Sequence, residues 1–250
     1  MNTSRSATKG EDQNPLGQLR IPRNSRTGEG RPEPARYFSA GYLTPRRWMS
    51  YYHQIKEVTS RADRGSSILE VGPGSQIGAV FYRRLARNYV SIDIEWELQP
   101  DVVGTVRHLP FKDNSFDIVA CFEVLEHLPF ADLDHCLGEL NRVASRYVIL
   151  SLPDAGYYLR LSVYLNLIHR IDLLKLKVRP FWAKHKKGEH YWELGKKGLS
   201  VKTMRRIIGR WFDPVREFVP SENMYHHFWV LVPRGRGSLA PLKRIQDSRR

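Results

Sequence analysis

Cysteine is scarce in this chain of 250 residues, whose two cysteines, Cys121 and Cys136, do not form a close pair. Lone cysteines of this kind are typical of reduced thiols rather than of a disulfide framework, so we expect a cytoplasmic protein. A secretory signal pattern is also missing, because residues 1–36 are polar and contain no apolar core. Both features predict a protein that is not exported.

Long apolar runs are missing as well. The longest stretch in which apolar residues predominate, 157–176, is interrupted by Arg160, His169, Arg170, Asp172 and Lys175. A membrane-spanning helix needs about 20 predominantly apolar residues, so the sequence excludes a transmembrane anchor. The hydrophobic share of 41% is nevertheless typical of a chain that buries a core, which excludes a mainly disordered or fibrous protein.

Acidic residues are outnumbered, and the net charge of +14 is unevenly distributed. Residues 159–216 hold 15 basic and 4 acidic side chains, whereas residues 37–158 hold 12 basic and 15 acidic ones. A segment of this composition is either a solvated basic face or a surface that attracts anionic lipid, nucleic acid or a phosphorylated substrate.

The chain divides into two tails and one domain. Residues 1–36 and 235–250 have almost no apolar periodicity and are predicted to be disordered basic tails. Residues 37–234 form the predicted domain, in which strands alternate with helices as in an α/β fold with a doubly wound, mostly parallel, seven-stranded sheet. The predicted strands are 67–72, 89–94, 102–106, 116–122, 147–152, 215–219 and 227–232, the last two as an antiparallel hairpin. One predicted helix begins at Pro45, and three others cover residues 78–87, 131–144 and 200–210.

A glycine turn follows the first predicted strand. Residues 68–74 read ILEVGPG, and Asp93 ends the next strand, 23 positions after Glu70. Gly72 and Gly74 would let the backbone approach a ligand closely, and Asp93 could accept hydrogen bonds from both hydroxyls of a ribose. The pattern predicts a nucleotide-binding site at the carboxyl end of the sheet.

Four motifs in order make residues 65–152 resemble the class I S-adenosylmethionine-dependent methyltransferases. They are EVGPG at 70–74, SIDI at 91–94, LPFKDNSFD at 109–117 and EVLEHL at 123–128. The resemblance implies a Rossmann-like methyltransferase fold and S-adenosylmethionine as cofactor. It also implies a set of cofactor-binding residues: Glu70, Gly72, Gly74, Asp93, Thr105, Val106 and Glu123. Two positions depart from the family pattern, since Gln76 replaces a common third glycine and Thr105 replaces a common aspartate that binds the adenine amino group.

A metal site is implied by two further elements. Glu123, Glu126 and His127 follow the fourth predicted strand, and the run GEHYWE at 188–193 adds His190. Both elements resemble the O-methyltransferases of ubiquinone biosynthesis and the small-RNA 2′-O-methyltransferases, in which they together can hold a divalent cation. The resemblance implies these four residues as ligands of magnesium, manganese or zinc.

Two readings without a metal remain open for these residues. The carboxylates could cap a helix or bond the cofactor amine, and His127 or His190 could act as the catalytic general base. The other histidines are expected to be surface or core fillers: His53, His108, His135, His169, His185, His226 and His227.

The insertion 155–199 is far longer than an ordinary strand-to-helix connection. Apolar residues recur in it at helical spacing: Tyr157, Tyr158, Leu161, Tyr164, Leu165, Ile168, Ile171 and Leu174. Basic residues follow: Arg179, Lys184, Lys186 and Lys187. The pattern predicts a helical insertion, either a lid that shields the methyl acceptor or an interfacial segment on an anionic membrane surface, with nucleic acid as a third alternative.

Taken together, these patterns predict an S-adenosylmethionine-dependent methyltransferase. The predicted reaction is O-methylation of a hydroxyl on a small-molecule, lipid-like, aromatic or glycan acceptor. Two alternatives stay open, namely an RNA methyltransferase and a cofactor-binding accessory subunit without turnover.

Overall fold

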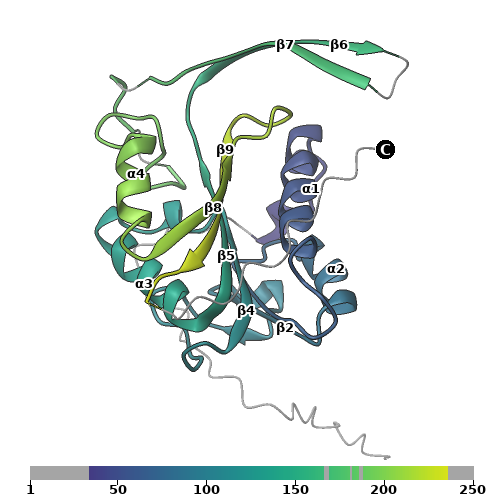
Figure 1. Ribbon diagram of the computed structural model, residues 1–250, viewed down its shortest axis with the longest axis vertical. Coiled ribbons are helices and arrows are strands. Elements are labelled where there is room, and N and C mark those ends of the chain that lie inside the picture. Colours follow the sequence, from purple (N-terminus) through teal and green to yellow (C-terminus); the bar gives the residue numbers. More distant parts are fainter. Residues whose placement is uncertain (1–33, 166–168, 181, 186–187, 236–250) are drawn as a thin grey trace, which may run out of the picture.

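A seven-stranded sheet forms the centre of the molecule in the computed structural model, which describes residues 34–165, 169–180, 182–185 and 188–235 (Figure 1). The strand order is β3-β2-β1-β4-β5-β9-β8. The strands are β1 Ser67–Val71, β2 Asn88–Asp93, β3 Val102–Val103, β4 Phe116–Phe122, β5 Ala144–Pro153, β8 Phe212–Phe218 and β9 His226–Pro233. The first five pair in parallel, whereas β9 is antiparallel to both β5 and β8. The predicted doubly wound sheet with an antiparallel C-terminal hairpin is confirmed.

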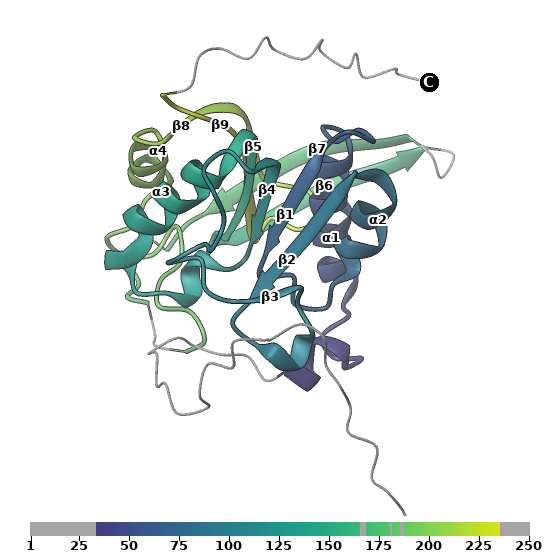
Figure 2. The ribbon, with the colours of Figure 1, turned by 90° about the horizontal axis from the view of Figure 1, so that it is seen from below.

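Helices cover both faces of this sheet. In the described ranges the α-helices are α1 Pro45–Thr59, α2 Ile77–Leu85, α3 Leu133–Val143 and α4 Val201–Ile208. The 3-10 helices are η1 Pro34–Phe38, η2 Trp96–Leu98, η3 Leu125–His127 and η4 Phe130–Asp132. Helices α1 and α2 lie on one face and α3 and α4 on the other (Figure 2). The two faces enclose separate buried clusters, one with Val58 and Tyr82 and the other with Leu137 and Met204.

Local sequence explains most of these elements. All five residues of β1 are buried, as expected for a parallel strand covered on both faces. Helix α1 begins as predicted, with Pro45 in its first turn and Thr44 Oγ1 accepting the backbone N–H of Arg47 at 3.3 Å. The spacing of Trp48, Tyr51, Tyr52 and Ile55 by three and four predicts one apolar face for this helix. The structure buries that face only in part, because Tyr51 is buried but Trp48 and Tyr52 are each 50% exposed.

The insertion is a β-hairpin, so the predicted helical insertion was wrong. Strands β6 Tyr157–Leu165 and β7 His169–Val178 form their own two-stranded antiparallel sheet. The same residues also fit a period of two, since Leu174 and Leu176 alternate with Lys175 and Lys177. That period places the apolar side chains on one face of a ribbon. Ile168, Lys186 and Lys187, which the sequence assigned to this segment, lie outside the described residues.

Both predicted tails lie almost entirely outside the described residues, which begin at Pro34 and end at Gly235. Residues 34–36, which the sequence placed in the first tail, belong to η1. Cys121 and Cys136 are both free and buried. No helix of the described ranges is long and apolar enough to cross a membrane.

Candidate active site

A pocket opens at the carboxyl ends of β1, β2 and β4. Among the predicted cofactor-binding residues, it is lined by Gly72, Asp93, Thr105, Val106 and Glu123. Its other lining residues are Tyr37, Val71, Ile92, Ile94, Glu95, Leu98, Gly104, Val124, His127 and Leu128. The structure brings these five residues to one pocket, because the carboxyl ends of neighbouring parallel strands meet at one edge of the sheet.

The glycine turn after β1 requires left-handed backbone. Gly72 has a φ of 66°, and a Cβ atom at this position would lie 2.4 Å from Val124 Cγ2. Gly74 has a φ of 51° and lies just beyond the lining residues, below the ring of Tyr37. Gln76 also has a positive φ, of 56°, so the position where the family commonly has a third glycine keeps a glycine-like backbone conformation.

The two carboxylates of the first two motifs, Glu70 and Asp93, differ in what they contact. Burial raises the pKa of the Asp93 carboxyl at the pocket to about 6, although the backbone N–H of Glu95 donates to its Oδ1 at 2.9 Å. Glu70 is not a lining residue, and its Oε2 instead accepts the hydroxyl of Tyr89 at 2.6 Å. Asp93 is thus available to a ligand, whereas Glu70 packs behind the pocket against Tyr89.

The pocket has a wall that the sequence did not reveal. Tyr37 of η1 lines it, and burial followed by the negative charge of Asp93 raises the pKa of the Tyr37 hydroxyl. Arg36 forms an ion pair with Glu189, which joins η1 to the loop that carries His190. The only sequence feature that could have indicated this wall is the aromatic pair at 37–38, directly after the polar N-terminal segment. Glu95, two residues after Asp93, was also missed.

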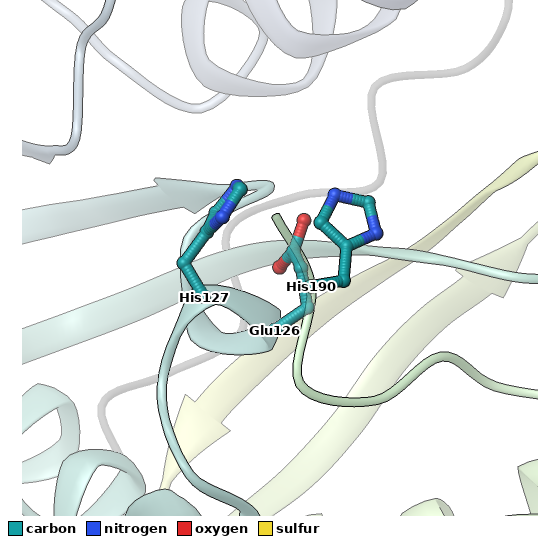
Figure 3. A group of neighbouring side chains, drawn as sticks. All are labelled: Glu126, His127 and His190. Carbon is teal, nitrogen blue, oxygen red and sulfur yellow. The ribbon is translucent and has the colours of Figure 1, made fainter. Parts of the chain in front are cut away.

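Glu126, His127 and His190 converge beside this pocket (Figure 3). Each offers one ligand atom, and these atoms all lie within 4.8 Å of one another. The Glu126 side chain is buried, and neither of its carboxylate oxygens has a hydrogen-bond partner among the described residues. Burial, and then the negative charge of Glu123, raise the pKa of this carboxyl well above its usual range. A buried carboxylate without partners is unfavourable unless it is protonated or meets a cation.

Both imidazole rings of this group are oriented by a hydrogen bond at Nδ1. His127 Nδ1 lies 2.9 Å from the carbonyl oxygen of Glu189, and His190 Nδ1 lies 3.0 Å from Glu193 Oε1. Since these oxygens accept, each Nδ1 carries the proton and each lone pair lies on Nε2. Tyr225 donates to the same Glu193 oxygen at 2.8 Å. An oxygen behind each Nδ1 is the usual support of metal-binding histidines.

Glu123, the fourth predicted ligand, is not part of this group. Its Oε1 accepts the hydroxyl of Ser151 at 2.7 Å, and its Oε2 lies 3.2 Å from His226 Nε2. The residue has a φ of 56°, a conformation that a glutamate adopts only under constraint. The structure therefore brings three of the four predicted ligands together and leaves Glu123 at the pocket wall.

A buried chain of polar groups orients Glu123. Asn223 Nδ2 donates to Ser50 Oγ at 2.7 Å, and the Ser50 hydroxyl donates to His226 Nδ1 at 2.6 Å. His226 Nε2–H is then directed at Glu123. Burial lowers the pKa of His226 to about 3, so this ring is neutral at physiological pH. The sequence analysis had assigned His226 to the fillers, and its contacts with α1 gave no local signal.

Comparisons with known proteins agree with this architecture. Residues 69–150 match the protein family described as "Methyltransferase domain". An uncharacterised protein of Methanocaldococcus jannaschii is 27% identical over 99 residues, which are 37% of this chain and 43% of that protein. The chain thus spans less than half the length of this relative.

Two solved structures have a similar fold. The N-methyltransferase NodS of Bradyrhizobium japonicum, in complex with S-adenosyl-L-homocysteine, has a TM-score of 0.51 and 11% identity, over 77% of this chain and 89% of its own. The magnesium protoporphyrin IX methyltransferase ChlM of Synechocystis, with bound S-adenosylhomocysteine, has a TM-score of 0.51 and 16% identity, over 80% of this chain and 92% of its own. At these identities the likeness shows the fold alone.

Proposed function

We propose that this chain is a class I S-adenosylmethionine-dependent methyltransferase and that it methylates a hydroxyl group positioned next to Glu126, His127 and His190. The match of residues 69–150 to a methyltransferase domain and the strand order of the sheet support the proposal. One observation carries the proposal. His127 belongs both to the lining of the cofactor pocket and to the group of three converging side chains. An acceptor oxygen held by this group would therefore lie next to the cofactor.

The residues of the pocket fit S-adenosylmethionine. Gly72 keeps a left-handed backbone at the pocket wall, where a Cβ atom would collide with Val124, and the Asp93 carboxylate can accept hydrogen bonds from a ribose. Glu123 would meet the amino group of the methionine part, while Thr105 and Val106 line the side expected for the adenine. When bound, the cofactor supplies a methyl group that is already activated on a sulfonium. The protein's main task is then to align the acceptor with this methyl group.

A divalent cation fits the group of three. The unpartnered Glu126 oxygens and the two Nε2 lone pairs make a mixed oxygen and nitrogen set, which suits magnesium, manganese or zinc. When bound, such a cation would lower the pKa of the acceptor hydroxyl. Glu193 and the carbonyl of Glu189 hold the two rings in place. Without a cation, His127 or His190 could take the proton of the hydroxyl.

The acceptor we propose is a lipid-like, aromatic or sugar hydroxyl, as the resemblance to the O-methyltransferases of ubiquinone biosynthesis suggests. A lipid-like acceptor would be reached at an anionic membrane surface. The protein incubated with methyl-labelled cofactor and with fractionated lipid, glycan and RNA extracts should label the lipid or glycan fraction. Label in RNA alone would favour an RNA methyltransferase, and cofactor binding without label would favour an accessory subunit.

The metal prediction is tested by binding and by turnover. Calorimetric titration of magnesium, manganese or zinc should show a site that is weakened at least about 100-fold in His190→Ala and His127→Ala. A chelator should stop methyl transfer and leave binding of S-adenosylhomocysteine almost unchanged. His135→Ala is the matched control, since His135 contacts the carbonyl of Arg107 and not the site.

Other outcomes discriminate between the mechanisms. If a histidine is the general base, the chelator has no effect, whereas the histidine variants lose about 10²–10⁴-fold in rate and change the pH profile. Activity that survives both the chelator and the double replacement of His127 and His190 contradicts both mechanisms and leaves positioning alone as the source of catalysis.

A further inference from the structure

One face of the β6–β7 hairpin is apolar and exposed. Cross-strand pairs place Tyr157 opposite Val178, Leu159 opposite Leu176 and Leu161 opposite Leu174. With Val163, these residues form what we call the apolar hairpin face. Their exposed fractions are Tyr157 74%, Leu159 58%, Leu161 55%, Val163 41%, Leu174 45%, Leu176 51% and Val178 45%.

The opposite face of the hairpin contacts the domain. Lys177 Nζ donates to the carbonyl of Asp154 at 2.8 Å, and Arg160 donates to the carbonyl of Ser221. The guanidinium of Arg46 in α1 lies 5.7 Å from the centre of the Tyr158 ring. Because side chains alternate along a strand, these contacts direct the apolar hairpin face away from the domain. Figure 1 shows the hairpin at the top, separated from the seven-stranded sheet.

A lid that covers the acceptor would pack on the domain through its apolar side, whereas this hairpin directs its apolar side away from the domain. A two-stranded hairpin is only marginally stable in water, and a contiguous exposed apolar patch usually marks an interaction surface. The polar side of the ribbon makes the intramolecular contacts, so the apolar side is left for a partner outside the described part of the chain.

The charge around the apolar hairpin face indicates which partner fits. Residues 157–185 contain six lysines and arginines and one acidic residue, Asp172. A second copy of the chain would bring the same positive charge to the contact, whereas an anionic bilayer complements both the charge and the apolar side chains. Tyr157 and the 59% exposed Trp182 are aromatic residues of the kind that favours the membrane interface.

We propose that the apolar hairpin face docks the protein on the surface of an anionic phospholipid bilayer. Strand β6 begins four positions after β5 ends, and the segment after β7 leads to His190. The docked bilayer would therefore lie on the side of the sheet where the cofactor pocket opens. Delivery of a lipid-like acceptor to that site rests on the proposed function, whereas docking itself does not.

The test is co-flotation of the full chain with two kinds of vesicle, phosphatidylcholine alone and phosphatidylcholine mixed with phosphatidylserine. We expect stronger binding to the anionic vesicles, weakened by salt. The double variant Leu159→Ala with Leu176→Ala should bind them at least about tenfold more weakly. The matched control, Val80→Ala with Phe81→Ala, removes side chains that are 61% and 49% exposed on α2 and should bind as the wild type does.

Folding of both variants is checked by the rise in melting temperature with S-adenosylhomocysteine, which neither variant should change. Wild-type protein that binds neither vesicle, or a hairpin variant that binds as well as the wild type, overturns the proposal. A concentration-dependent dimer that is lost only in the hairpin variant would assign the face to a second copy instead. None of these readouts involves methyl transfer, so a failure here leaves the proposed function standing.

Discussion

Four buried or half-buried carboxylates near the site differ in how their charge is compensated. Glu70 accepts the Tyr89 hydroxyl, Asp93 accepts backbone N–H groups, and Glu123 contacts Ser151 and His226. Only Glu126 has two buried oxygens without a hydrogen-bond partner among the described residues. This difference separates carboxylates that support the structure from one that is ready for an external cation or proton.

Glu70 predicts a pH dependence of stability. Burial raises its pKa in the folded state to about 7, above the value of about 4.3 in an unfolded chain. Its stabilising contribution is therefore fully present below about pH 4.3 and is lost as the pH rises through 7. Glu70→Gln stays neutral, so at pH 8 it should be more stable than the wild type by about 2–3 kcal/mol, with no difference at pH 4.

The measurement is urea unfolding at the two pH values, with the exposed Glu97→Gln as control. Since Glu70 lies outside the pocket lining, its variant should also bind S-adenosylhomocysteine almost normally. A Glu70→Gln protein that loses cofactor binding but keeps the wild-type pH dependence would return Glu70 to the cofactor-binding residues.

Whether the role of a residue could be predicted from the sequence depended on how far along the chain its contact partners lie. Gly72 and Asp93 belong to short motifs, so their role at the strand ends was readable from local spacing. His226 is defined by Ser50 in α1 and by Glu123 after β4, which only the folded chain brings together. Tyr37 was missed for the same reason, since the pocket that it covers is formed by residues far along the chain.

At the scale of elements, the buried carboxylate of Asp154 joins the base of the β6–β7 hairpin to the seven-stranded sheet. Asp154 is fully buried and accepts hydrogen bonds from Arg179 at 2.6 and 2.8 Å, with Lys177 Nζ at 3.0 Å and His227 Nδ1 at 3.2 Å. Burial alone would raise the pKa of the Asp154 carboxyl, but the bonds from His227 and Arg179 and the charge of Lys177 lower it. The carboxylate thus contributes stability at neutral pH that is lost in acid.

Asp154→Asn should lower the free energy of unfolding by about 3–5 kcal/mol, because it leaves buried positive charge uncompensated. The control Asp213→Asn breaks the exposed pair with Arg234 and should cost at most about 1 kcal/mol. Urea unfolding at neutral pH measures both, and faster amide exchange in β6 and β7 should accompany the first variant. Equal losses of unfolding free energy in the two variants would contradict the stabilising role of Asp154 at the base of the hairpin.

The hairpin also shows where pattern reading of an element fails. Apolar residues in 157–174 match the helical period and the period of two at once, so the sequence alone did not distinguish the two structures. Strand β1 was predicted to within one residue and β4 was predicted with its observed bounds, Phe116–Phe122, because continuous apolar runs bounded by turns allow few alternatives. Strand β5 begins three residues before its predicted start at Tyr147. The hairpin is instead stabilised by pairing between β6 and β7 and by the contacts of Lys177 and Arg160 with the domain, which the sequence pattern does not show.

At the scale of the whole molecule, the cofactor pocket, the group of three and the hairpin all adjoin the carboxyl edge of one sheet. The basic excess lies in residues 159–216, which include the hairpin, whereas residues 37–158 carry slightly more acidic than basic side chains. The predicted cofactor recognition and the proposed membrane docking thus belong to different parts of the chain. The cofactor site should remain intact when the apolar hairpin face or the proposed metal ligands are altered.

Calorimetric and thermal titration with S-adenosylhomocysteine tests the central claim, that the pocket at Gly72 and Asp93 holds the cofactor. At about 100 times its Kd the ligand should stabilise the wild type by about 2.7 kcal/mol, seen as a rise in Tm of about 5–10 °C. Asp93→Ala should bind at least about tenfold more weakly through loss of the ribose hydrogen bonds, whereas Asp213→Ala should bind normally. A wild-type protein whose Tm does not change at saturating ligand would contradict the account.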